Sequence, residues 1–434
     1  MGAPTPSDRW QTQGAVTIVA TIAAERVARV RTLLEEMGAD PAGNATVPLG
    51  ALDGVHFARL FVTEAAVGPD GTPAPAHVVY MSDVDGSADA HVAQLADVAG
   101  DGLDRVFGDC AGYPRDRPAA HAERIDFLRR GCVKGGANYV NTIGRTVAQI
   151  RGEAALRRAI EDHLDLHRDA LSSMDALGIR AAIRDVVTAD EGLRWALTPA
   201  PSPPLAYRAK ETALLVAPVL GGVILLPVLL PVALGWLVAL RIHEARDPAP
   251  HPVLTEEHLD ELRAIEDHVA MNQFTVVGFV KPGWFRGMTT RLVVGLVDFG
   301  ARHLFNNGNL AGVKTIHFAR WMPLGGWSRL VFCSNYDGST ESYMDDFIDK
   351  LAWGLNASFS NGAGYPPTRW LLFGGARDEE TFKAVLRSAQ IPTQVWFSAY
   401  DTVTALNVVT NARVRAGLSG DATEAQARAW LQLL

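Results

Sequence analysis

The feature that most constrains the fold of this 434-residue chain is an internal duplication. Three blocks recur in the same order: "VHFARLFV" (55–62) and "IHFARWMP" (316–323), "SDVDGS" (82–87) and "SNYDGS" (334–339), "FGDCAGYP" (107–114) and "FSNGAGYP" (359–366). Asp85 and Tyr113 are 28 residues apart (113 − 85), as are Asp337 and Tyr365 (365 − 337). Matched blocks at equal spacing predict two tandem copies of one domain.

The pattern within each copy predicts an α+β fold. The first copy has a β-rich segment at 15–22, a helical periodicity at 23–38 and then a hairpin of two strands. The second copy has its expected elements at 273–280 (strand), 286–307 and 342–359 (helices) and 369–375 (strand). This order predicts ferredoxin-like βαββαβ repeats. Because such a sheet has one open face, we expect the two repeats to pack sheet to sheet.

An apolar segment separates the two copies. Residues 212–240 contain no charged side chain, and runs of this length are typical of membrane segments. Pro218, Pro227 and Pro231 predict that the helix is broken into pieces too short to span a bilayer. We therefore expect a re-entrant or interfacial helical hairpin, which also keeps both copies on one side of the membrane.

The domain boundaries follow from these features. In chain order we predict a disordered N-terminus 1–13, the first repeat with a helical extension 14–197, a Pro-rich linker 198–211, the membrane-associated segment 212–240, a linker 241–258, the second repeat 259–420 and a C-terminal helix 421–434.

Composition narrows the partners and the compartment. A net charge of −8 without a long Lys or Arg run argues against nucleic acid as a partner. Three scattered cysteines, Cys110, Cys132 and Cys333, do not suggest a disulfide framework or a zinc cluster. The first 13 residues lack the apolar core of a signal peptide. We expect a monotopic or re-entrant protein on the cytoplasmic face of the inner membrane, with membrane lipid as a partner.

With the element order and the "SNYDGS" block in view, the sequence resembles the dimeric α/β-barrel superfamily in its internally duplicated form. That group includes the haem-binding dye-decolourising peroxidases. Of their Gly-Phe-x-Asp-Gly loop with a catalytic Asp, this chain keeps Asp337-Gly338. The resemblance implies haem as a cofactor, with Arg320 and Asp337 as a distal catalytic pair and His317 or His303 as the axial ligand. No metal beyond the haem iron is expected.

The first copy carries equivalents of these residues, namely His56, Arg59 and Asp85. An alternative without catalysis is that each Arg forms an ion pair with the Asp of its own hairpin, Asp85 or Asp337, and that Asp-Gly-Ser caps the following helix. Strand alternation places His317 and Arg320 on opposite faces unless a β-bulge intervenes.

These features together predict a membrane-associated, haem-dependent peroxidase-like or oxygenase-like enzyme that acts on a hydrophobic, lipid-derived substrate. One alternative is a non-catalytic protein that binds lipid or another hydrophobic small molecule. A cofactor-free α/β-barrel isomerase or monooxygenase is another. The sequence leaves open whether the protein forms a homo-oligomer.

Overall fold

The computed structural model describes residues 10–114, 119–306 and 308–434, and it shows a mixed α+β fold with corresponding elements in the two copies. The first copy contains β1 (Gln13–Ile22), α1 (Val27–Gly38), β2 (Val55–Thr63), β5 (Ala76–Asp85), α2 (Ala88–Phe107), α3 (His121–Gly131), β6 (Ala137–Val140) and α4 (Val147–Leu166). The second contains β7 (Met271–Phe279), α9 (Trp284–His303), β8 (Ile316–Leu324), β9 (Arg329–Asp337), α10 (Thr340–Phe359), α11 (Glu379–Ala389), β12 (Val395–Ser398) and α12 (Ala405–Leu418).

The remaining elements lie between or after the copies. They are α5 (Arg168–Leu171), α6 (Ala176–Ala189), α7 (Leu205–Glu244), α8 (Glu256–Arg263), α13 (Glu424–Leu431) and the short strands β3 (Ala66–Val67), β4 (Pro73–Ala74), β10 (Thr368–Arg369) and β11 (Phe373–Gly374).

Apart from the short strands β3, β4, β10 and β11, the described strands form two four-stranded antiparallel sheets. The two copies exchange their last strands between these sheets. The first sheet has the order β1-β5-β2-β12, and the second has the order β6-β8-β9-β7. Thus β6 of the first copy pairs with β8 of the second, and β12 of the second copy pairs with β2 of the first. The two copies therefore cannot separate without breaking backbone hydrogen bonds in both sheets.

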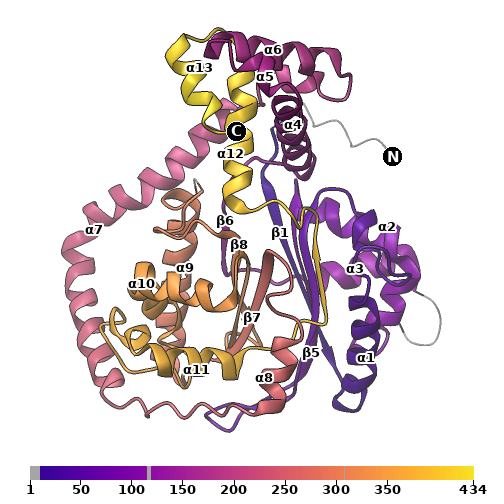
Figure 1. The fold of residues 1–434 in the computed structure, drawn as a ribbon. Helices are drawn as coiled ribbons and strands as arrows, with labels where there is room; N and C mark the ends of the chain where they lie inside the picture. The colour runs from indigo at the N-terminus through magenta and orange to yellow at the C-terminus, as the bar shows by residue number, and fades with distance from the viewer. Residues whose placement is uncertain (1–9, 115–118, 307) are drawn as a thin grey trace.

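The exchanged strands also join the edges of the sheets. Just before β6, Val133 N donates to Thr17 O on the edge strand β1, at 2.9 Å. Just before β12, Ile391 N donates to Thr275 O on the edge strand β7, also at 2.9 Å. Each crossing segment therefore hydrogen-bonds to one sheet and then to the other. Figure 1 shows α1, α2 and α3 outside the first sheet and α9, α10 and α11 outside the second.

The repeated Asp-Gly-Ser block ends a strand and begins a helix in both copies, as the sequence predicts. Ser87 Oγ accepts a hydrogen bond from Ala90 N at the start of α2, and Ser339 Oγ accepts one from Ser342 N at the start of α10. The intervening glycine has φ of 81° at Gly86 in the first copy, a left-handed conformation that an L-residue adopts only at a cost.

The element between the copies is one helix, so the predicted hairpin is wrong. The 40-residue α7 begins at Leu205 and ends at Glu244, and Pro218, Pro227 and Pro231 all lie inside it. A proline removes one backbone hydrogen bond and bends a helix without necessarily ending it. The bent α7 arches around the second copy in Figure 1. It also takes residues from both predicted linkers.

Two other predicted boundaries change. The fourth strand of the second copy is β12 and not 369–375, because that stretch forms only the short β10–β11 hairpin. The predicted N-terminal segment 1–13 lies largely outside the described residues, and β1 already begins at Gln13. The predicted C-terminal helix within 421–434 is present as α13.

Candidate functional site

The repeated arginine of each copy crosses to the sheet of the other copy. Arg320 Nη1, from β8, donates to the carbonyl oxygen of Val16 at 2.6 Å and to Oγ1 of Thr17 at 2.8 Å. Its Nη2 donates to the carbonyl oxygen of Ser82 at 2.9 Å and to the carboxylate of Asp83. All four acceptors belong to the first copy.

Arg59 makes four equivalent contacts in the opposite direction, and its Nη1 also donates to Oε1 of Gln273 at 3.2 Å. Its Nη1 donates to the carbonyl oxygen of Phe274 at 3.0 Å and to Oγ1 of Thr275 at 2.8 Å. Its Nη2 donates to the carbonyl oxygen of Ser334 at 3.0 Å and to Oδ1 of Asn335 at 2.6 Å. The only chemical change among these four partners is that Asn335 stands where the first copy has an aspartate. Burial lowers the pKa of Arg59.

The expected pairs of Arg320 with Asp337, and of Arg59 with Asp85, are therefore wrong. Both aspartates instead bind the repeated histidines: His317 Nε2 lies 2.8 Å from Asp337, and His56 Nε2 lies 2.9 Å from Asp85. The second carboxylate oxygen of each Asp accepts a hydrogen bond from the first residue of a helix, because Ala405 N donates to Asp337 at 2.7 Å and Val147 N to Asp85 at 3.0 Å. These aspartates connect each strand to α12 or α4.

A β-bulge in each copy overturns the expected separation of His and Arg. The register of β2 with β5 shifts at His56, and that of β8 with β9 shifts at His317. The ring of His56 lies 5.2 Å from that of Phe318, and the ring of His317 lies 5.4 Å from that of Phe57. His and Arg of one copy are thus both directed toward the other copy.

The space beside these arginines is too small for haem. The cavity between the sheets is lined by Arg59, Arg320 and Cys333, among others, and measures about 10 Å³, which is roughly room for one water molecule. Burial raises the pKa of the Cys333 thiol. Neither Asp337 nor His317 is among the residues that line this cavity.

The second candidate axial ligand lies elsewhere. His303 is near the end of α9, where its Nδ1 is 3.5 Å from the carboxylate of Glu211 on α7 and its side chain is only 6% exposed. It precedes β8 by 13 residues (316 − 303), and it is not among the residues that line the cavity beside Arg59 and Arg320.

An almost entirely apolar cavity lies between α9 and α10, outside the second sheet. It measures about 300 Å³ and is lined by Leu296, Val297 and Phe305, by Trp321 at its floor, and by Trp353 among other apolar residues. Among its described lining residues there is no His, Cys, Tyr or Met, so it offers no usual axial ligand for haem iron. Its chemistry suits a hydrocarbon body.

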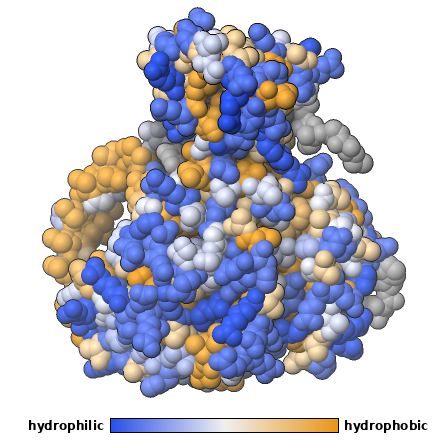
Figure 2. Space-filling model, viewed as in Figure 1, coloured by the Kyte–Doolittle hydropathy of each residue, from blue (hydrophilic) through white to orange (hydrophobic). Residues whose placement is uncertain are grey.

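The charge-free middle of α7 is apolar and solvent-exposed on all sides. Val223, Ile224 and Leu225 are consecutive, and their side chains are 65%, 76% and 53% exposed. Because successive helical residues project about 100° apart, these three already cover most of the circumference. α7 is the one described helix that is long and apolar enough to cross a bilayer by length and composition. Figure 2 shows it as an apolar arch that stands clear of the body.

Both ends of this arch are fixed to α9. Glu211 approaches His303, whereas Trp236 Nε1 donates to Oγ1 of Thr289 at 3.1 Å. The helix rises about 38 Å over the 25 residues from Glu211 to Trp236, but the partners are only about 21 Å apart along the 14 residues of α9 (303 − 289). The middle of α7 must therefore bow outward.

The C-terminal end of α7 is held by a buried carboxylate. Glu244 accepts hydrogen bonds from Trp370 N and Leu371 N, both at 2.9 Å, and from Oγ1 of Thr368 at 3.1 Å. This contact positions the β10–β11 hairpin, whose tip exposes Trp370, Leu372 and Phe373. A second apolar surface therefore lies beside the arch.

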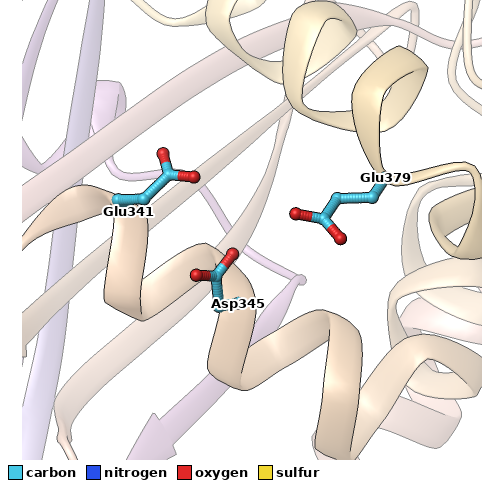
Figure 3. A group of neighbouring side chains, drawn as sticks. All are labelled: Glu341, Asp345 and Glu379. Carbon is cyan, nitrogen blue, oxygen red and sulfur yellow. The ribbon is translucent and has the colours of Figure 1, made fainter.

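Three acidic side chains form a separate cluster on the surface. Figure 3 shows Glu341 and Asp345 on α10 facing Glu379 on α11. Lys383 Nζ donates to all three carboxylates, at 2.6, 2.6 and 2.7 Å. The ammonium group thus supplies the positive charge that a metal ion would bring.

Sequence reasoning missed the apolar pocket and the hairpin tip. The signal for the tip was present as "RWLLF" (369–373), which is too apolar for an exposed loop without a partner. The pocket had no local signal, because its walls come from helices that meet only in the folded chain. No family model and no curated protein matches the sequence.

Proposed function

We propose that this protein is a monotopic membrane protein that binds a hydrophobic, lipid-derived molecule in the pocket between α9 and α10. The observation that carries the proposal is the arch α7, which is apolar around its whole circumference. A helix that binds a protein partner needs only one apolar stripe. A helix that is apolar on every side can contact hydrocarbon on every side. The bilayer would lie outside the arch, and acyl chains would lie beneath it.

The attachment of α7 supports a monotopic arrangement. Glu211 and Trp236 both contact α9, so the two ends of the apolar segment meet the same folded body. A helix that crossed a bilayer would place its ends about 30 Å apart on opposite sides. We therefore place the arch within one leaflet. We also propose that this leaflet is the cytoplasmic one, as predicted from the sequence.

The position of the pocket supports a route from lipid to protein. Leu296 lines the pocket and is also 62% exposed on α9, the helix that the arch spans. Trp353 on α10 lines the pocket and is 51% exposed. A molecule could thus leave the lipid and enter the pocket along apolar side chains alone. We further propose that the two copies form a single-chain α/β-barrel of the dimeric class, which supplies a rigid support for these helices.

The haem-dependent activity implied by the resemblance is less well supported. The residues assigned to it are used in contacts between the copies, and neither described cavity near them combines haem-sized room with an axial ligand. The visible spectrum of protein expressed with a haem supply tests this alternative. A Soret band that disappears in His303→Ala or His317→Ala would restore haem as the cofactor and overturn our preference for ligand binding.

The membrane proposal is tested by flotation with vesicles of phosphatidylcholine and phosphatidylglycerol. Ile224→Asp and Val228→Asp change exposed side chains, so the fold should be retained. A charge buried in hydrocarbon at a helix centre costs about 2.5 to 3.5 kcal/mol, and we expect more than a tenfold loss of vesicle binding for each variant. The matched control is Leu166→Asp, at an exposed Leu on α4. Equal binding by all variants would contradict insertion of the arch.

The pocket is tested separately by native mass spectrometry of co-purified lipid. Ala357→Trp places an indole in the pocket and should strongly reduce the bound fraction. Ala51→Trp, at an exposed position, is the control. If both variants retain the same lipid load as the parent protein, the pocket is not the binding site.

A further inference from the structure

A second pocket lies at one end of the two sheets, away from α9 and α10. Its volume is about 310 Å³, and it is enclosed by the ends of β2, β7 and β9, by α8 and by the segment before β12. Its apolar wall consists of Val62, Val277, Phe279, Ile391 and Pro392. Unlike the pocket between α9 and α10, this pocket also has a charged side chain at its floor.

That floor is Arg329, a buried cation. Arg329 is only 3% exposed. Its Nη2 donates to the carbonyl oxygen of Pro75 at 2.7 Å and to Nδ1 of His77 at 2.9 Å, and its Nη1 donates to the carbonyl oxygen of Glu64 at 3.3 Å. Its Nε is buried and has no hydrogen-bond partner among the described residues.

No carboxylate of the described residues forms an ion pair with Arg329, whose three partners are neutral oxygens and an imidazole nitrogen. The imidazole must be neutral at Nδ1 in order to accept from a guanidinium. Burial, followed by the charge of Arg329, lowers the pKa of His77 to about 4. A buried charge without a counter-ion is unfavourable. Arg59 is also held by neutral acceptors alone, but it has five of them, whereas Arg329 has three and keeps a buried Nε without a partner among the described residues.

The duplication gives a reason to treat this arginine as more than a support. The structural arginines Arg59 and Arg320 occur in both copies and make equivalent contacts. At the start of the other repeated strand, the first copy has His77 where the second has Arg329, and the two side chains meet. At this strand position only the second copy carries an arginine, and that arginine lines a pocket.

The charged side chains at the rim are one arginine and two glutamates. Arg31 forms an ion pair with Glu64, Glu261 is exposed, and His258 Nε2 is 3.0 Å from the carbonyl oxygen of Arg387. The positive charge without a carboxylate partner is therefore at the floor, and the rim supplies no net attraction for an anion in solution. A ligand that gains from this arrangement has an anionic head at Arg329 and an apolar body along the wall.

We propose that this pocket binds a short organic carboxylate, whose carboxylate group pairs with the guanidinium of Arg329 and whose hydrocarbon chain packs on Phe279 and Ile391. This site is separate from the apolar pocket and does not depend on the membrane proposal. Guanidinium and carboxylate form strong, directional hydrogen bonds, and the pair would neutralise the buried charge.

The test is isothermal titration calorimetry of the 434-residue chain with hexanoate, using hexanamide as a neutral probe of the same shape. We expect saturable binding of hexanoate and at least tenfold weaker binding of hexanamide. Arg329→Met removes the charge and should abolish the preference, whereas Arg31→Gln, at the rim, should keep it. Binding of hexanoate and hexanamide with equal affinity, or no binding of either, would overturn the proposal.

Two further variants keep the result interpretable. Ile391→Trp fills the pocket but leaves Arg329 in place, and it should also abolish hexanoate binding. This variant provides the test if Arg329→Met fails to fold. Ala357→Trp blocks the apolar pocket and should leave hexanoate binding unchanged. Loss of hexanoate binding in Ala357→Trp alone would assign the carboxylate to the apolar pocket and overturn this inference.

Discussion

The crossing arginines allow a prediction in which one copy acts as the reference for the other. Arg320 binds the carboxylate of Asp83, whereas Arg59 binds the amide of Asn335 at the equivalent position. Asp83→Asn therefore gives Arg320 the partner that already works in the other copy. Asp83→Leu removes the acceptor at this position, so that Arg320 keeps only the neutral acceptors Val16, Thr17 and Ser82.

The magnitude follows from burial. The side chains of Arg320 and Asp83 are 8% and 16% exposed, so water screens their interaction only weakly. Removing one member of a buried ion pair costs about 3 to 5 kcal/mol, because the other charge stays buried without a partner. We expect this loss for Asp83→Leu. Asp83→Asn retains an acceptor for the charged donor and should cost only about 1 to 2 kcal/mol.

The assay is the urea or thermal unfolding midpoint, followed by tryptophan fluorescence. The control is the same pair of substitutions at Asp165, whose side chain is 75% exposed and lies 2.9 Å from Arg168. An exposed pair contributes about 0 to 1 kcal/mol, so Asn and Leu at this position should behave alike. Equal destabilisation by Asn and Leu at position 83 would refute the assignment of Arg320 as a clamp between the copies.

Two other measurements address titration and metal binding. Burial lowers the pKa of His91 to about 4, from about 6.5 when unfolded, so its contribution to stability is complete above pH 6.5 and is lost as the pH falls toward 4. Between pH 7.5 and pH 5, His91→Gln should therefore lose about 2 kcal/mol less free energy of unfolding than the parent protein, and an identical loss would contradict a neutral buried His91. Dialysis against EDTA should leave the unfolding midpoint unchanged, because Lys383 occupies the centre of the acidic cluster, and a fall of several degrees would show that a metal ion contributes there.

Local and repeated features could be predicted from the sequence. The equal spacing of the repeated blocks gave two copies, and Asp-Gly-Ser gave the helix starts at Ser87 and Ser339, because a cap satisfies N–H groups only a few residues away. The strands around His56 and His317 were also expected. The bulges at these positions were not, because a bulge depends on how the neighbouring strand is paired.

The partners of the repeated residues could not be predicted. Arg320 and Asp83 are 237 residues apart in the chain, and the sequence favoured the nearer Asp337. The exchange of β6 and β12 reverses this preference, because it holds the two sheets together and places each arginine against the other copy. Proximity in sequence is a weak guide when a duplicated chain pairs with itself.

The apolar segment shows the same division. The sequence by itself determined that exposing residues 212–240 to water is unfavourable, because the hydrophobic effect depends on the apolar area that water contacts. Whether they form a hairpin or an arch was decided by tertiary contacts, because the attachments at Glu211, Trp236 and Glu244 fix both ends on one body and let the prolines bend the helix between them. The same holds for Arg329, whose charge is visible in the sequence but whose lack of a counter-ion arises only when strands from both copies surround it.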